Sequence, residues 1–408
     1  MNQWRQLPRN VWVTTLTSFL TDVSSEMILN LVPLFLSNVL GVSTAVIGLI
    51  EGVAETTSSI LKAVSGWWSD KIQGRKWLAV AGYGLSAIAK PFLYIVTGWG
   101  GVLAVRFTDR VGKGIRTAPR DALIAGSIDE QHRGLAFGLH RAGDTAGALV
   151  GLSIALGVVL ASQSDALDLS RDTFRTLVLI GIIPGLLAVL VLAIGAREVA
   201  SKPKSGQATV QKMPLSRDFK FFLVVVAIFT LGNSSDGFLV LLAQRRGLHV
   251  AEILGMLMTF NLVYTLFSGP LGALSDKVGR RKLILGGWSI YSLIYLLFAL
   301  TATGWQVWLV YAFYGLYYAS VEGTAKALVA DLVPKIQHGT AYGVYNATIG
   351  LMAFPASLLA GVLWQGVGGW DGFGPRAPFI AGAALAMIAV GLLAWHNPVK
   401  PAEPNQSA

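Results

Sequence analysis

The chain consists of long apolar runs separated by short polar breaks, without the alternating apolar and polar stripes of a soluble protein. A helix that crosses a bilayer needs about 20 mostly apolar residues, and we count twelve runs of at least that length. The pattern therefore predicts an all-α membrane protein with twelve transmembrane helices. Their expected ranges are 11–40, 45–66, 77–97, 101–127, 134–161, 174–195, 218–243, 250–273, 283–302, 305–332, 340–365 and 377–396.

Composition agrees with this class, because 53% of the residues are hydrophobic and only 13% are charged, against roughly a quarter charged in soluble domains. A net charge of +10 would suggest nucleic acid in a soluble protein, but in a membrane protein basic loops report topology, so we expect no nucleic-acid partner. The chain has no cysteine, which excludes disulfide and thiolate chemistry. Its five histidines form no His-x3-His pair, so we expect neither a metal site nor a cofactor.

One long polar segment, AREVASKPKSGQATVQKMPLSRD, interrupts the apolar runs and has the composition of a linker. It predicts an N-terminal six-helix bundle (1–196), a cytoplasmic linker (197–217) and a C-terminal six-helix bundle (218–408). The first apolar run is too long for a signal peptide and lacks a cleavage pattern, so we expect it to stay in the protein.

The basic loops set the expected orientation. An even number of spans puts both termini on one side, and SDKIQGRK, the linker and SDKVGRRK all lie on that side. The positive-inside rule assigns it to the cytoplasm. We therefore expect a multi-pass protein of the cell inner (plasma) membrane with both termini cytoplasmic.

The two halves resemble each other. GWWSDKIQGRK and GALSDKVGRRK begin 206 positions apart, RGLAFGLHRA matches HGTAYGVYNA, and DVSSE in the first span corresponds to GNSSD in the seventh. Repeats of this kind predict two six-helix pseudo-repeats around a central cavity, with a solute site between them near the midplane.

With these motifs the chain resembles the major facilitator superfamily over essentially its whole length. The family pattern Gly-x3-Asp-x2-Gly-Arg-Arg/Lys follows the second and the eighth span, and the first copy here has one extra residue before its second glycine. The resemblance implies the superfamily fold and cytoplasmic gating loops that latch the two halves; for the basic residues, simple membrane topology is the alternative. The expected gating-loop residues are Gly66, Asp70, Gly74, Arg75 and Lys76, and Gly272, Asp276, Gly279, Arg280 and Arg281.

Carboxylates inside the spans form a second pattern. An ionisable group at the centre of a membrane helix costs at least ~2.5 kcal/mol, so it normally faces a water-filled cavity or a partner. Two carboxylates one turn apart share a helix face and do not easily both stay ionised, so one of them can carry a proton. The alternative is that each one is a static partner of a basic residue. The proton-coupling candidates are Asp22, Glu26, Glu51, Glu55 and Asp109.

The stretch DRVGKGIRTAPRD places several cations on the fourth span. It lacks the order of a Walker phosphate loop, and its i, i+4, i+7 spacing puts a row of cations on one face. Members of the superfamily often carry an arginine in this span, and the resemblance implies that Arg106 or Arg110 is its equivalent. Such a row favours an anionic or zwitterionic substrate, and an internal ion-pair network with Asp22, Glu26, Asp109, Asp121 and Asp144 is the alternative. The substrate-binding candidates are Arg106, Arg110, Lys113, Arg116, Arg141, Asp236, Asn261, Tyr314, Tyr318, Glu322 and Asn346.

Glycines mark two further helix contacts. Gly112 and Gly114 predict close packing of the fourth span on the first or fifth span. Gly138, Gly147 and Gly151 partly match a glycine pattern of antiporting members of the family, although helix packing alone would also account for them.

These observations predict a secondary active transporter that works by alternating access, by proton-coupled efflux (antiport) of a small organic anion or amphiphilic compound. Proton-coupled uptake of an anionic or zwitterionic metabolite is one alternative. A membrane-embedded enzyme or a non-transporting sensor on the same fold is another, but no nucleophile or metal constellation supports an enzyme. The expected partners are a small-molecule substrate, protons and membrane lipid, and we expect a monomer.

Overall fold

The computed structural model describes residues 7–72, 74–129, 132–163, 166–199, 215–334 and 337–396. Within these ranges the side chains of residues 63, 66–72, 272, 273, 275, 276, 322 and 339 are not described. The described part is almost entirely helical, and its one isolated β-bridge joins Val367 to Trp370.

The helices of the N-terminal half are α1 (Arg9–Leu29), α2 (Val32–Leu34), η2 (Phe35–Val39), α3 (Thr44–Ile72), α4 (Arg75–Ala89), η3 (Lys90–Tyr94), α5 (Trp99–Gly126), α6 (Arg133–Gln163) and α7 (Arg171–Gly195). Those of the C-terminal half are α8 (Arg217–Leu231), α9 (Gly237–Arg245), α10 (Val250–Val278), α11 (Arg280–Leu300), α12 (Gly304–Asp331), α13 (His338–Gln365) and α14 (Ala377–Trp395).

These elements correspond to the twelve expected spans, three of which are broken. The first span comprises α1, α2 and η2, the third comprises α4 and η3, and the seventh comprises α8 and α9. Pro33 and Pro91 lie at the starts of α2 and η3, where a missing N–H is tolerated. The seventh span was expected to be continuous, but it is interrupted between Leu231 and Gly237, where glycine, asparagine and serines favour turns over helix.

Length and apolar composition alone identify eight of the described helices as able to cross a membrane. The remaining spans fall short for different reasons. The breaks shorten α4 and α8, and the cations and carboxylates of α5 lower its hydropathy.

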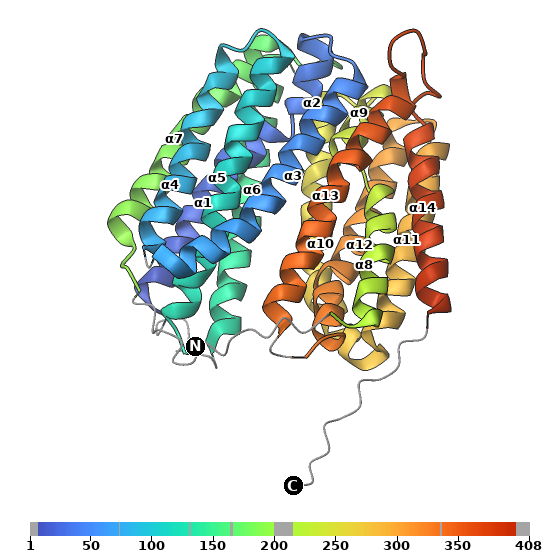
Figure 1. Ribbon diagram of the computed structural model, residues 1–408. Helices are drawn as coiled ribbons and strands as arrows, with labels where there is room; N and C mark the ends of the chain where they lie inside the picture. Colours follow the sequence, from blue (N-terminus) through green and yellow to red (C-terminus); the bar gives the residue numbers. More distant parts are fainter. Residues whose placement is uncertain are drawn as a thin grey trace.

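The two bundles lie side by side and meet at one end of the molecule, near α2, α3, α9 and α13 (Figure 1). That end is opposite the one where α1 begins and α14 ends. Along the seam, Thr44 donates its backbone N–H to Gln365 Oε1 at 2.9 Å and its hydroxyl to the Gly361 carbonyl at 3.0 Å. A Cβ at Gly48 would lie 2.2 Å from the Ser357 carbonyl oxygen, so the backbones of α3 and α13 touch.

A group of amides closes the same end. Asn38 in η2 and Gln244 in α9 bond reciprocally, at 3.2 Å and 2.9 Å between their amide nitrogen and oxygen atoms. Both also donate to Asp168 Oδ1, at 3.1 Å and 3.2 Å, in the loop between α6 and α7. Asn38 and Gln244 are 206 positions apart, which is the repeat spacing, so equivalent residues of the two halves seal this end together.

The partners expected for Gly112 and Gly114 were wrong. Gly112 packs on Gly82 and Ser86 of α4, and Gly114 packs on Leu61 of α3. Residues two apart on a helix point about 200° apart, so the two glycines face different neighbours. The cationic row of α5 occupies the face between them, and that face is turned to the space between the halves.

Gly147 marks the contact between α6 and α1, since a Cβ at this position would lie 2.4 Å from the Phe19 carbonyl oxygen. We expect Gly147→Ala to lower the free energy of unfolding by about 1–3 kcal/mol, because a backbone atom cannot move aside as a side chain can. Gly157→Ala on the same helix is the matched control, because nothing lies within 4 Å of a Cβ there. Unfolding in detergent measures both; equal midpoints for the two variants would contradict this contact.

Candidate functional site

Two connected cavities lie between the halves. The first, which we call the central cavity, has a volume of about 490 Å³ and is lined by α1, α3 and α5 from one half and by α8 to α10, α12 and α13 from the other. The second, which we call the vestibule, has a volume of about 540 Å³. Its lining residues on α1, α3, α5 and α12 lie nearer the end where α1 begins. The residues that line both are Asp22, Glu26, Lys113, Arg116, Asp236, Phe260, Asn261 and Tyr318.

The charges differ along this path. The central cavity alone contains three carboxylates and two cations, namely Glu51, Glu55, Asp109, Arg106 and Arg110. The vestibule alone contains four cations and one carboxylate, namely Lys62, Arg120, Arg141, Lys326 and Asp144. The path is therefore acidic toward the closed end and basic toward the open end.

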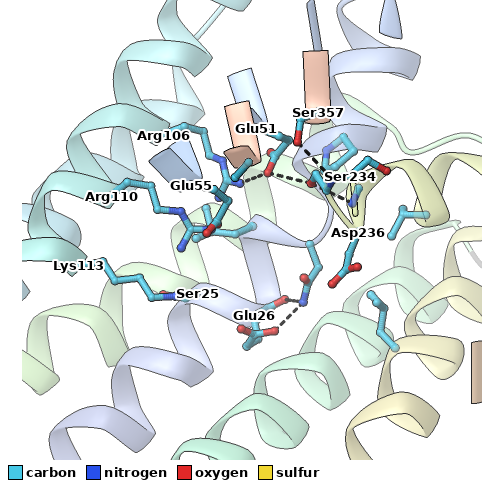
Figure 2. Close-up of a pocket in the computed structure, with 18 of the residues that line it drawn as sticks. Ser25, Glu26, Glu51, Glu55, Arg106, Arg110, Lys113, Ser234, Asp236 and Ser357 are labelled. Atoms are coloured by element: carbon cyan, nitrogen blue, oxygen red, sulfur yellow. Dashed lines mark hydrogen bonds and ion pairs between the residues drawn. The ribbon is translucent and has the colours of Figure 1, made fainter. Parts of the chain in front are cut away.

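Two of the α5 arginines are neutralised by α3. Arg106 forms a buried ion pair with Glu51, and Arg110 pairs with Glu55 at 2.9 Å between Nη2 and Oε1. Figure 2 shows Arg106 pointing toward Glu51 and Arg110 lying beside Glu55. The Glu51 carboxylate also accepts a hydrogen bond from Ser235 Oγ of the other half at 3.4 Å. Glu51 therefore holds an arginine and contacts the second bundle at once.

Lys113 and Asp22 face the same space without such neutralisation. Neither side chain forms a hydrogen bond or ion pair within the described residues, although both residues line both cavities. Glu26, one turn beyond Asp22, accepts a hydrogen bond from Asn30 Nδ2 at 2.8 Å. The guanidinium of Arg116 stacks over Tyr83 at 4.3 Å from the ring centre. A free ammonium and a free carboxylate are thus available where the cavities join.

The C-terminal half contributes one carboxylate, Asp236, and several tyrosine side chains of α12. Asp236, at the start of α9, accepts a hydrogen bond from the Tyr314 hydroxyl at 3.1 Å. Tyr314 is fully buried and lines neither cavity, whereas Tyr318 lines both and Tyr311 lines the central one. Tyr314 thus contacts Asp236 from outside the cavities, and Tyr318 lines both of them.

The other substrate-binding candidates are distributed unequally. Asn261 lines both cavities, and Arg141 lines the vestibule, where it donates to the Tyr264 hydroxyl at 2.8 Å. Asn346 is exposed and is not among the lining residues of either cavity. The side chain of Glu322 lies outside the described residues.

Sequence reasoning missed two lysines. Lys62 of α3 lines the vestibule; it lies seven residues after Glu55, so helical spacing places it on the same face. Lys90 of η3 is buried and donates to Ser24 Oγ at 2.9 Å and Ser25 Oγ at 2.8 Å. Its isolation in an otherwise apolar span was the signal, because a buried ammonium requires acceptors.

The described contacts of the expected gating loops stay within their own halves. The backbone N–H groups of Arg75 and Lys76, at the start of α4 after Gly74, donate to the Glu198 carboxylate at 2.9 and 3.0 Å, as suits an anion at a helix N-terminus. In the second copy, Arg280 pairs with Asp331 at 2.5 Å.

The other described residues of the second gating loop also make their contacts within the C-terminal half. Gly279 adopts a φ of 96°, which favours glycine, and Arg281 donates to the Leu393 carbonyl at 2.7 Å. The side chains of Asp70 and Asp276 and the surroundings of Gly66 and Gly272 are not described. The latch between the halves remains a prediction.

Comparison with known proteins assigns this architecture to a family. The profile of the Major Facilitator Superfamily matches residues 14–357 and 221–408. An uncharacterized MFS-type transporter of Methanocaldococcus jannaschii is 36% identical over 395 residues, which is 95% of each chain. The fosmidomycin resistance protein of Escherichia coli is 24% identical over 67% of this chain and 66% of its own length.

Solved structures agree in fold. The crystal structure of a bacterial homolog of the human lysosomal transporter Spinster, in an inward-facing and unoccupied conformation, has a TM-score of 0.76. It is 16% identical in sequence, and the match covers 95% of this chain and 96% of the other.

Proposed function

Because the chain belongs to the major facilitator superfamily, a family of secondary transporters and not of enzymes, we propose that it exports a small organic anion or amphiphilic compound in exchange for protons. The proposal includes a multi-pass location in the cell inner membrane with both termini cytoplasmic. In that orientation the vestibule opens toward the cytoplasm, where an exporter collects its solute.

The observation that carries the proposal is the charge at the junction of the two cavities. A free ammonium on Lys113 and a free carboxylate on Asp22 lie beside an aromatic surface from Phe260 and Tyr318. An ammonium binds an anionic group, the rings accept an apolar body, and a carboxylate in a low-dielectric site exchanges a proton. These are the parts that proton-coupled transport of such a solute requires.

Alternating access requires the closed end to open. The contacts that would separate are those between the halves at Thr44 and Gln365, at Asn38 and Gln244, and at Glu51 and Ser235. Each consists of a few hydrogen bonds, and a hydrogen bond contributes only about 0.5–1.5 kcal/mol to stability. The two halves can therefore stay together at this end and still separate when binding of the solute or a proton shifts the equilibrium between the closed and open states.

The test is transport by purified protein in liposomes. With an imposed proton gradient, we expect movement of an anionic aromatic solute such as benzoate or phenyl phosphate against the direction of proton flow. Lys113→Gln should raise the KM for that solute about tenfold, because it removes the free ammonium. Lys220→Gln, at an exposed position on α8 outside both cavities, is the control. Movement in the same direction as the protons would replace export with symport, and no movement of any tested anion would overturn both.

Uptake of a zwitterion by proton symport is a second candidate. It is favoured by Asp22, Glu26 and Asp236, which lie at the cavity junction together with Lys113. These carboxylates suit an ammonium group as well as Lys113 suits a carboxylate. Competition by amino acids, absent with matched anions, would favour this candidate over export.

A further inference from the structure

Six basic and four acidic residues line the vestibule, so its lining has a net positive charge. Lys62, Arg120, Arg141 and Lys326 belong to the vestibule alone, with Asp144, while Asp22, Glu26 and Asp236 are shared with the central cavity. Burial of one net charge is costly, and several like charges in one cavity repel one another. Such a set is stable when water or an anionic ligand occupies the space.

The cations come from both halves of the molecule. Arg120 on α5 and Lys326 on α12 are 206 positions apart, so the pseudo-repeat places equivalent cations on the two walls of one cavity. Lys62 on α3 and Arg141 on α6 extend the N-terminal wall. An anion in the vestibule would therefore be attracted by both bundles at once.

These cations are not equally available. Arg120 pairs with Asp121 at 2.8 Å and donates to Ser18 at 3.3 Å, and Arg141 is held by Tyr264. The side chain of Lys62, by contrast, forms no hydrogen bond or ion pair within the described residues. Its ammonium has three rotatable donors, and none of the described side chains accepts from it.

Arg116 adds a second unsatisfied donor group. Only 8% of this residue is exposed, it lines both cavities, and its Nη1 atom is buried without a hydrogen-bond partner. A buried guanidinium nitrogen without an acceptor is costly, and the positive charge of this guanidinium attracts an oxyanion in the vestibule. Lys113 lines the same space between Arg116 and the central cavity.

We propose that the vestibule is a second binding position, separate from the central cavity, which takes an oxyanion (a carboxylate or a phosphate) on Lys62, with Arg116 and Lys113 at its inner boundary. This second position rests on the proposed function in one respect: the solute would occupy the vestibule before it reaches the central cavity. The cavity of about 540 Å³ accommodates a small solute. Phe260 and Tyr318, shared by both cavities, provide an apolar surface along which the solute advances.

Binding by calorimetry on protein in phosphatidylcholine nanodiscs tests this position without any transport step. The probes are phenyl phosphate, benzoate and the neutral benzyl alcohol. We expect the two oxyanions to bind and the alcohol not to bind. Lys62→Gln should weaken oxyanion binding about tenfold and Lys62→Arg should retain it, because the charge rather than the shape is required. Lys282→Gln, an exposed position outside both cavities, should bind as the wild type does.

The outcomes separate this position from the proposed function. Loss of binding in Lys62→Gln, without pH-driven transport in wild-type liposomes, supports the vestibule site and overturns the transport proposal. Transport with equal oxyanion affinity in wild type and Lys62→Gln overturns the vestibule site alone, as does failure of the wild type to bind either oxyanion.

A parallel arm identifies the source of the oxyanion. Phosphatidylglycerol added to the nanodiscs will compete with phenyl phosphate if a lipid headgroup can reach Lys62. It will leave the affinity unchanged if the position admits only a free solute. Either result supports an oxyanion position at Lys62, provided that the competition or the binding is lost in Lys62→Gln.

Discussion

Asp22→Asn is expected to reduce solute transport driven by a proton gradient to the level of empty liposomes, and to leave exchange of labelled for unlabelled solute at equal pH on both sides. Asparagine keeps the shape and polarity of aspartate, but it cannot bind or release a proton. The solute site would therefore still form and alternate, without coupling to the gradient.

The structure distinguishes Asp22 from Glu51 and Glu55, two of the other proton-coupling candidates. Glu51 and Glu55 are held by Arg106 and Arg110, and an ion-paired carboxylate gives up its charge reluctantly. Asp22 faces both cavities and makes no hydrogen bond or ion pair within the described residues. It is the carboxylate best placed to take a proton from water on one side and release it on the other.

The measurement is the ratio of gradient-driven transport to equal-pH exchange in the same liposomes. Asp172→Asn, at an exposed position in the first turn of α7 outside both cavities, is the matched control and should keep the wild-type ratio. Undiminished gradient-driven transport in Asp22→Asn would exclude Asp22 as the coupling group. Loss of exchange as well would assign it to solute binding instead.

Arg106→Met is expected to lower the free energy of unfolding by about 3–5 kcal/mol, because it leaves the Glu51 carboxylate buried without its cation. Only 3% of the Arg106 side chain and 7% of the Glu51 side chain are exposed, so water cannot replace the lost partner. The double variant Arg106→Met with Glu51→Gln should recover most of the loss, since no uncompensated charge then remains.

Arg110→Met is the matched comparison on the same helix. Its partner Glu55 has 44% of its side chain exposed, so water in the cavity can solvate the carboxylate, and we expect a loss below about 1 kcal/mol. Equilibrium unfolding in mixed micelles measures all three variants. Equal losses for Arg106→Met and Arg110→Met would show that burial does not distinguish the two pairs.

Much of the fold could be predicted from the chain alone. The spans, the repeat at 206 positions and the resemblance to the superfamily all follow from local composition and from spacing along one chain. The interruption of the seventh span at Asn233 to Asp236 was not predicted, because a short polar stretch within an apolar run is compatible with a continuous helix as well as with a break.

The candidate site was predicted as a set of residues but not as a set of roles. The sequence placed Arg106, Arg110 and Lys113 on one helix face, but it could not tell which of them would be neutralised. That depends on the register of α3 against α5, a contact between residues 55 positions apart in the case of Glu51 and Arg106. Lys62 was missed for the same reason, since only the packing of the helices shows that it lines the vestibule.

By itself, the sequence determined that this protein is a twelve-span membrane protein built from two related halves, because apolar length, charge placement and repeat spacing are properties of the chain. Only the tertiary structure decided which charged side chains form ion pairs with one another and which are available to a solute. The ion pairs of α3 with α5 neutralise Arg106 and Arg110, while the side chains of Asp22, Lys113 and Lys62 have no ion-pair partner among the described residues. The physical reason is that the energy of a charge inside a membrane protein is set by the neighbours within a few ångströms, and those neighbours come from other helices.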